Sequence, residues 1–326
     1  MSVNRPLRDV SLNDFAAHRL APKLLSCVAM PKPRQVLPGQ FYLITRRCAH
    51  RQFLLRPDEA TNNAFIYCLA EAAQRYGIEV LMTVAESNHH HTPIFDRYGR
   101  FPEFIEHFHK MLARSQNAFR GRWENFWVAQ EPCVTRLLDR ETVIEKIIYT
   151  AANPVKDRLV DRAHHWPGVN GYANLMTGRP LRAHRPRHFF RAEGPMPDTV
   201  ELQLTIPPEL GPADEVIAKV RAGVEAIERH VAEECKRTGA RVIGRRNILA
   251  QSWKDTPTSS EPRRNLRPRF AGRLVERVKA LLEYRTFLAA YREARQRWLA
   301  RGATVFPRGT YWLARFAAVP IAALPA

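Results

Sequence analysis

The chain has 326 residues, of which 51 are Lys or Arg and 32 are Asp or Glu, so its formal net charge at pH 7 is +19. With 45% hydrophobic and 25% charged residues, its composition is typical of a globular protein and excludes a disordered or fibrous chain. The positive balance favours a polyanionic partner, and nucleic acids and anionic membrane surfaces are the commonest.

The cysteines and the apolar C-terminal stretch indicate in which part of the cell we expect the protein. The five cysteines are widely spaced and include no C-x-x-C pair, which argues against a disulfide framework or a cysteine zinc site and favours a reducing, cytoplasmic location. The apolar stretch 311–326 contains Arg315 and two prolines and is too short to span a bilayer. We therefore expect no membrane partner.

Hydrophobic periodicity predicts regular structure after an irregular N-terminal arm at residues 1–38. A helix is expected to begin at Pro57-Asp58-Glu59 and to end at Gly77, and another helix, at 140–152, is expected to end at Asn153-Pro154. The other expected elements up to residue 128 are strands Phe41–Thr45, Ile78–Ala85, His89–Phe95 and Trp123–Val128 and a helix at 102–118.

This order of elements is the split βαβ pattern of a ferredoxin-like α+β fold, an antiparallel sheet with helices on one face. It defines a domain at residues 39–172. Residues 173–326 form an extension that we expect to be mostly helical, with a strand at Val200–Ile206 and helices near 213–238 and 272–300. Its segment 241–315 carries 18 basic and five acidic residues, which makes DNA contact a plausible role beside that of a solvated basic helix face.

Two segments carry residues suited to chemistry. In an extended strand, His89 and His91 point to the same face and could share a divalent metal, while His90 points to the other face. On the helix at 140–152, Tyr149 lies about 140° away from Ile144 of the apolar stripe, with Asn153 one turn further on. Taken alone, these residues are equally consistent with a chance His-x-His pair and a surface tyrosine.

Several motifs resemble those of the HUH-superfamily single-tyrosine transposases, particularly the branch associated with repetitive extragenic palindromes. Asn88-His89-His90-His91 resembles the Asn-His-hydrophobic-His signature, with His90 in the hydrophobic position and Thr92-Pro93 where aliphatic residues are usual. The segment from Tyr149 to Lys156 resembles Tyr-x-x-x-Asn-Pro-Val-Arg/Lys, and Trp166 to Tyr172 resembles Trp-Pro-x-Ser-x-Tyr. Arg122–Trp127 is loosely similar to Trp-Gln-x-Arg-Phe.

The resemblance implies that residues 39–172 are a catalytic domain in which His89 and His91 bind Mg²⁺ or Mn²⁺ and Tyr149 is the nucleophile. It also implies that Asn153 is a further metal ligand. Such a protein cleaves and rejoins single-stranded or hairpin DNA through a covalent phosphotyrosine, without a nucleotide cofactor. Glu145 is a candidate proton acceptor or simply an exposed glutamate, and a monomer is favoured over a homodimer.

Contacts with DNA would combine phosphate binding and base stacking. Candidates in the first domain are Arg46, Arg47, Arg120, Arg122, Trp123 and Trp127, although the aromatic residues could equally be core residues. In the extension the candidates are Arg263 and Arg264.

Two other functions fit parts of the pattern. A non-catalytic nucleic-acid-binding regulator would keep the fold without the chemistry, although we find no RNA-binding signature on a central strand. A metal-dependent phosphodiesterase that uses water would keep the histidines without needing Tyr149.

Overall fold

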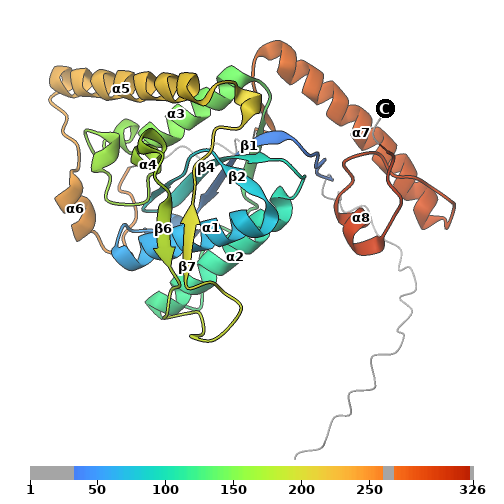
Figure 1. The fold of residues 1–326 in the computed structure, drawn as a ribbon, viewed down its shortest axis with the longest axis horizontal. Coiled ribbons are helices and arrows are strands. Elements are labelled where there is room, and N and C mark those ends of the chain that lie inside the picture. The colour runs from blue at the N-terminus through green and yellow to red at the C-terminus, as the bar shows by residue number, and fades with distance from the viewer. Residues whose placement is uncertain (1–32, 260–267, 324–326) are drawn as a thin grey trace, which may run out of the picture. The chain divides into compact units, whose positions relative to one another are not determined.

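The computed structural model describes residues 33–259 and 268–323. Its main sheet has the strand order β2-β4-β1-β5-β8, with β3 paired to β4 beyond the end of β2 (Figure 1). All pairings are antiparallel except that between β5 and β8. The α+β class and the ferredoxin-like strand order are confirmed, but the expectation that the helices lie on one face is wrong, because helices cover both faces of the sheet. The strands are β1 (Gln40–Arg47), β2 (Ile78–Val80), β3 (Val84–Glu86), β4 (His89–Asp96), β5 (Cys133–Leu137) and β8 (Phe270–Ala271).

Helices α1 (Glu59–Tyr76) and α2 (Phe101–Arg120) pack together on one face of this sheet. The side chain of Asp58 caps α1 by accepting a hydrogen bond of 2.8 Å from the amide of Thr61, and Gly77 ends the helix with a φ of 64°. The core on this face includes Phe65 and Phe108, whose rings meet edge to face at 5.4 Å.

Helix α3 (Arg140–Lys156) contacts β3 and β4 and also packs against α5 (Ala213–Thr238). The sequence predicted that this helix ends at Asn153, but it continues through Pro154 to Lys156. Proline removes one helical hydrogen bond here, that from its own nitrogen to the carbonyl of Thr150, and α3 ends two residues later. Asn153 consequently sits inside the helix, one turn after Tyr149.

Two strand predictions are wrong. Ile78–Ala85 is not one strand but β2 and β3, separated by three residues that lie opposite Thr92 and Pro93 of β4. Trp123–Val128 is a loop whose Phe126 and Trp127 are buried, and only Trp127 forms an isolated bridge, to Cys48. The strand that pairs with β1 on this side is β5, in which the buried Thr135 and Leu137 alternate with the half-buried Val134 and Arg136.

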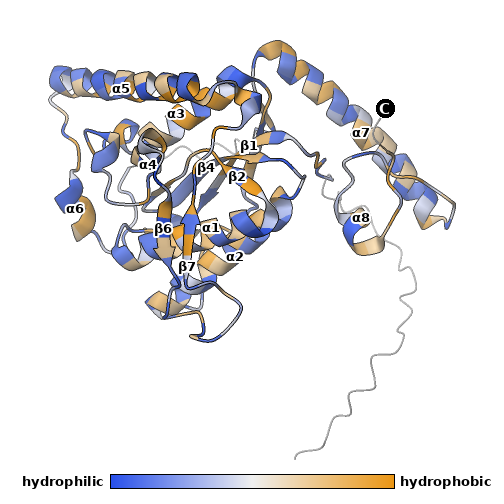
Figure 2. Ribbon diagram, in the orientation of Figure 1, coloured by the Kyte–Doolittle hydropathy of each residue, from blue (hydrophilic) through white to orange (hydrophobic). Residues whose placement is uncertain are grey.

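The region beyond residue 172 belongs to the same compact unit as the sheet, residues 34–326. A two-stranded hairpin covers α1, and α5 covers α3 at a close approach where a side chain at Gly223 would meet Ile148. Hydrophobic and hydrophilic residues alternate along α5 and α7 (Figure 2). The elements of this region are α4 (Tyr172–Thr177), β6 (Leu181–His184), β7 (Thr199–Leu202), α5, α6 (Arg245–Ala250), β8, α7 (Leu274–Leu299) and α8 (Trp312–Ala317).

Helices predominate in this region, as the sequence predicted. Among the described residues, no helix is both long enough and apolar enough to cross a membrane.

Candidate functional site

Strand β4 presents its three histidines alternately to the two faces of the sheet. His89 and His91 share the face that α3 covers, with ring centroids 4.9 Å apart. The Nδ1 atom of His91 is 2.7 Å from the hydroxyl of Thr45 on β1, and that of His89 is 2.8 Å from the side-chain oxygen of Asn88. These contacts fix both rings, so two imidazoles stand side by side on a rigid strand.

His90 points into the core on the opposite face. Its Nε2 atom lies 2.9 Å from Nε2 of His109 on α2, and its Nδ1 lies 3.1 Å from the hydroxyl of Thr92. Burial lowers the pKa of His90 to about 3, so both rings of the pair are neutral and one of the two nitrogens donates to the other. The unusual residue in the motif is therefore a core residue and does not belong to the site.

Tyr149 on α3 lies directly against the histidine pair. Its ring centroid is 5.2 Å from that of His91, in an edge-to-face arrangement. The ammonium groups of Lys156 and Lys146 lie 4.5 and 5.5 Å from the same ring. Burial, with the charges of Asp157 and Glu86, raises the pKa of Tyr149 to about 12, so the phenol keeps its proton at neutral pH.

Asn153 is linked to His89 through Glu86, a residue that was not predicted from the sequence to belong to the site. Its side-chain amide donates a 2.7 Å hydrogen bond to Glu86, whose other carboxyl oxygen is 3.8 Å from Nε2 of His89. Burial and the neighbouring Asp157 raise the pKa of Glu86 to about 8. The sequence does hint at Glu86, because this acidic residue directly follows the buried-strand pattern of Ile78–Ala85 and lies three positions before His89.

The segment from Trp166 to Tyr172 holds these elements together. The indole N–H of Trp166 donates to the carbonyl of Ala85 in β3, and the side-chain amide of Asn170 donates to the carbonyl of Ala151 in α3, each over 2.9 Å. Gly168 is required here because a Cβ atom would come within 2.4 Å of the indole nitrogen of Trp166. The third motif of the sequence thus connects the histidine hairpin to the tyrosine helix.

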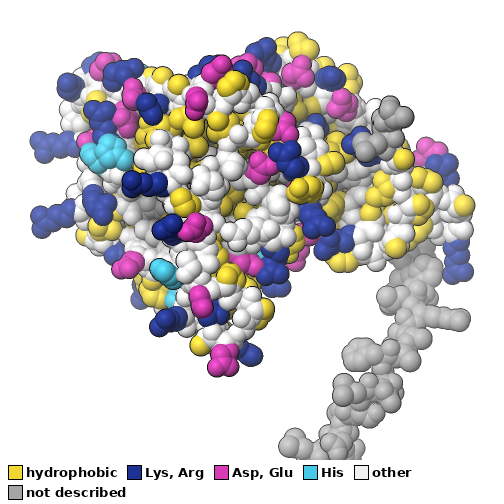
Figure 3. Space-filling model, viewed as in Figure 1, with side chains coloured by type: hydrophobic (Ala, Val, Ile, Leu, Met, Phe, Trp, Pro, Cys, Tyr) yellow, Lys and Arg dark blue, Asp and Glu magenta, His cyan; other side chains and the backbone are white. Residues whose placement is uncertain are grey.

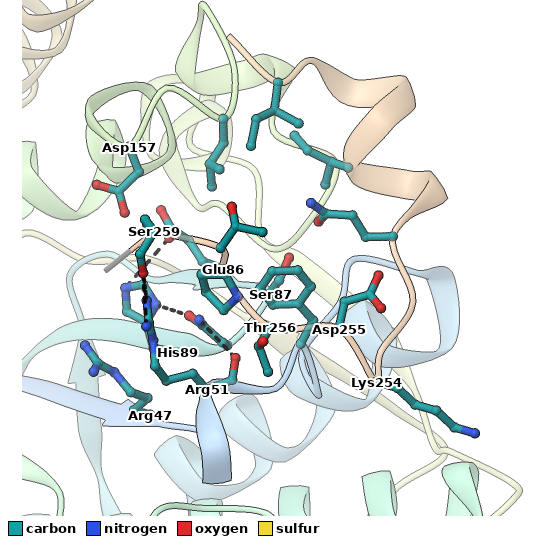
Figure 4. Close-up of a pocket in the computed structure, with 18 of the residues that line it drawn as sticks. Arg47, Arg51, Glu86, Ser87, His89, Asp157, Lys254, Asp255, Thr256 and Ser259 are labelled. Carbon is teal, nitrogen blue, oxygen red and sulfur yellow. Dashed lines mark hydrogen bonds and ion pairs between the residues drawn. The ribbon is translucent and has the colours of Figure 1, made fainter. Parts of the chain in front are cut away.

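A cleft of about 960 Å³ opens beside His89 (Figure 4). Arg47, Glu86 and Asp157 line it from the sheet and from the end of α3. Its other side is formed by residues 251–259, which follow α6. Basic, acidic and hydroxyl side chains therefore meet in one cavity next to the histidine pair.

Arg46 and Arg47, both predicted to contact DNA, lie on opposite faces of the sheet. Arg47 pairs across the strands with His89 and lies on the site face. Arg46 lies on the opposite face, where its guanidinium is 5.2 Å from the ring of Trp127 and where burial lowers its pKa to about 10. Arg47 is therefore the better placed of the two for a phosphate near His89.

The predicted cluster at residues 120–127 is largely structural. The side chain of Arg120 is only 4% exposed and pairs with Asp58 at 3.3 Å, and Arg122 is similarly buried. Trp127 is buried and its indole N–H donates to the carbonyl of His109, so a DNA base cannot stack on it in this structure. Trp123 differs, with 97% of its surface exposed.

Arg263 and Arg264 lie outside the described residues. On the face shown in Figure 3, Lys and Arg side chains are spread over several elements and interspersed with Asp and Glu.

Among the described residues, no group of three or more His, Cys, Asp or Glu side chains is arranged to hold a metal ion. The imidazoles of His89 and His91 lie side by side, and Asn153 is joined to His89 through Glu86. With so few protein ligands, a cation bound here would keep most of its coordination positions for water or phosphate oxygens, as Mg²⁺ and Mn²⁺ can.

Neither a family model nor a curated protein matches this chain. Two solved structures show a distant likeness. A REP-associated tyrosine transposase bound to a REP hairpin is 15% identical, with 55% of this chain and 99% of that chain covered and a TM-score of 0.39. A transposase-like protein from Deinococcus radiodurans R1 is 17% identical, with 32% and 84% covered and a TM-score of 0.26. At these values neither likeness assigns the chain to a family.

Proposed function

We propose that this protein is a tyrosine-dependent DNA strand transferase that cleaves and rejoins single-stranded or hairpin DNA. The observation that carries the proposal is the contact of Tyr149 with the histidine pair on one face of the sheet, with Asn153 of the same helix linked to His89 through Glu86. These residues come from two segments that are far apart in the sequence. A hydrophobic core does not require polar side chains at these positions.

In this proposal His89, His91 and the amide oxygen of Asn153 hold Mg²⁺ or Mn²⁺. When bound, the cation would neutralise the charge that develops on the phosphate and on the leaving oxygen. Lys146 and Lys156, beside the ring of Tyr149, would add positive charge where the anionic phosphodiester approaches.

The reaction makes one bond and breaks one. The hydroxyl oxygen of Tyr149 attacks phosphorus and the bond between phosphorus and the 3′ oxygen breaks. The 3′ oxygen takes up a proton from water and leaves as a 3′-hydroxyl, while the 5′-phosphate stays on the tyrosine. Because the pKa of Tyr149 is raised to about 12, its proton must pass to a base during attack. Glu145 is exposed on α3, so we assign this role instead to the carboxylate of Asp157, which follows the last residue of α3 and lines the cleft beside His89.

The reverse step rejoins DNA when a 3′-hydroxyl from the same or another strand attacks the phosphotyrosine. The phosphotyrosine conserves the energy of the broken phosphodiester, so no nucleotide cofactor is required. One chain supplies all four side chains, which is consistent with an active monomer.

The proposal is tested by looking for a covalent adduct between the protein and DNA. The purified protein is incubated with Mn²⁺ and a pool of single-stranded hairpin oligonucleotides labelled at the 3′ end, and is then run on a denaturing gel, with Tyr149→Phe and a chelator as controls. We expect an adduct that is absent from both controls. Metal-dependent cleavage that persists in Tyr149→Phe would instead indicate hydrolysis by water, and salt-sensitive binding without cleavage would indicate a non-catalytic regulator.

A further inference from the structure

The segment formed by residues 251–259, the connector segment, is fixed against the sheet domain by its backbone. The amide of Phe53 donates to the carbonyl of Asp255 over 2.9 Å, and the guanidinium of Arg51 makes two hydrogen bonds of 3.1 Å to the carbonyl of Ser259. Just before it, Arg56 donates to the carbonyl of Leu249 over 2.7 Å. The connector segment therefore follows a defined path along the cleft.

A cluster of cations around Trp253 anchors the segment. The guanidinium groups of Arg120 and Arg122, at the end of α2, lie 5.6 and 5.5 Å from the Trp253 ring, and the ammonium of Lys254 lies 5.4 Å from it. Arg120 is held in turn by Asp58 and by the hydroxyl of Thr61. Two arginines that the sequence suggested as DNA contacts are thus positioning residues for the wall of the cleft.

The cleft combines three kinds of surface that an unpaired nucleotide strand requires. Arg47 and Arg51 provide positive charge, and Thr256, Thr258 and Ser259 of the connector segment provide hydroxyl donors. Figure 4 shows Lys254 at the rim, pointing away from His89. The apolar surface comes from Ile243, which is 39% exposed, and from the half-buried Leu159.

We propose that the connector segment forms one wall of a binding site for an unpaired DNA strand that leads to His89. Phosphates would lie against Arg47, Arg51 and the connector hydroxyls, and a base would contact the apolar surface. A base paired and stacked in a duplex cannot turn toward this surface, so the site selects single-stranded DNA. This inference rests on the proposed function and adds the region beyond residue 172 to the substrate site.

The test measures binding without cleavage. In a Tyr149→Phe background, the affinity for a fluorescent oligothymidine is measured by anisotropy for Thr256→Glu and for the matched control Thr286→Glu. Both changes alter the net charge equally at exposed positions, but Thr286 lies on α7 outside the cleft. We expect Thr256→Glu to weaken binding about tenfold at low salt, because it places a carboxylate among the phosphate contacts, and the control to change it less than twofold.

A second variant, Trp253→Ala, tests the same binding site without introducing a charge. Releasing the anchor should weaken binding of the single strand and leave the weaker binding of a duplex of the same length unchanged. Hydrogen exchange then shows whether the amides of residues 251–259 become protected when the oligonucleotide binds. Equal affinities for Thr256→Glu and Thr286→Glu, or connector amides that exchange equally fast with and without DNA, would overturn the inference, whether or not Tyr149 forms an adduct.

Discussion

The hydrogen bond between Asn153 and Glu86 is the contact that ties the tyrosine helix to the histidine hairpin, and it can be measured directly. Both residues are buried, at 2% and 4% exposure, and the donor and acceptor atoms are 2.7 Å apart. Asn153→Ala removes the donor and leaves a buried carboxyl oxygen without its partner. We expect this variant to lose about 2–3 kcal/mol of unfolding free energy, the sum of a lost hydrogen bond and an unsatisfied polar atom.

A double-mutant cycle separates this bond from the packing of the two side chains. Urea unfolding at pH 7 is measured for the wild type, Asn153→Ala, Glu86→Ala and the double variant, each without metal. We expect a coupling energy of about 1–2 kcal/mol for this buried hydrogen bond.

The cycle also has a conservative control. Glu86→Gln keeps an acceptor oxygen, so a cycle that uses Gln in place of Ala should show little coupling, because Gln preserves the bond to Asn153. A coupling energy below about 0.5 kcal/mol in the alanine cycle would refute the view that this contact connects the two elements.

Three further changes test other parts of the structure. Burial raises the pKa of Glu71, but its hydrogen bonds to His107 and Arg75 outweigh this and lower it below the ordinary 4.5. The stabilisation by Glu71 is therefore present above pH 4.5 and lost as the pH falls through the lowered pKa, so the deficit of Glu71→Gln in urea unfolding should shrink in acid. Asp139 caps α3 through the amide of Thr142, and Asp139→Ala should cost about 1 kcal/mol in the same assay. Trp123→Ala, at an exposed position, should change the unfolding free energy by less than about 0.5 kcal/mol, so that any loss of DNA affinity in anisotropy reports a direct contact.

The sequence predicts well where one local rule decides the outcome. Asp58 and Gly77 mark the two ends of α1 because a side-chain cap and a left-handed glycine act within a few residues. The alternation of His89, His90 and His91 follows from the period of two in a strand. The same rules placed Tyr149 off the apolar stripe of α3, where it meets His91.

The sequence predicts poorly where distant segments decide the environment of a residue. Aromatic residues at 123–128 resemble a strand, but Phe126 and Trp127 are buried by packing against the rest of the domain without joining a sheet. Arg120 and Arg122 resemble a DNA-binding pair because nothing local reveals Trp253, which follows more than a hundred residues later. Charge and aromatic content alone do not distinguish a contact with DNA from a contact within the protein.

Pro93 shows how a local departure from a motif can shape the site. The carbonyl of Pro93 accepts a hydrogen bond from the amide of Leu81, which lies between β2 and β3. The N–H that proline lacks would point to the same side of β4, so the missing donor faces the break between these two strands. Val80 pairs with Ile94 and Val84 pairs with His91, which leaves three residues opposite two and makes a bulge.

That extra residue decides which face Glu86 occupies. In an unbroken ladder continuing from Val80, Val84 would pair with His90 and Glu86 would lie on the core face with the side chains of β2. The bulge shifts the register by one, so Glu86 pairs with His89 and lies on the face where Asn153 reaches it. The proline that weakens the strand in the sequence thus sits at the irregularity that brings an acidic side chain to the histidine pair.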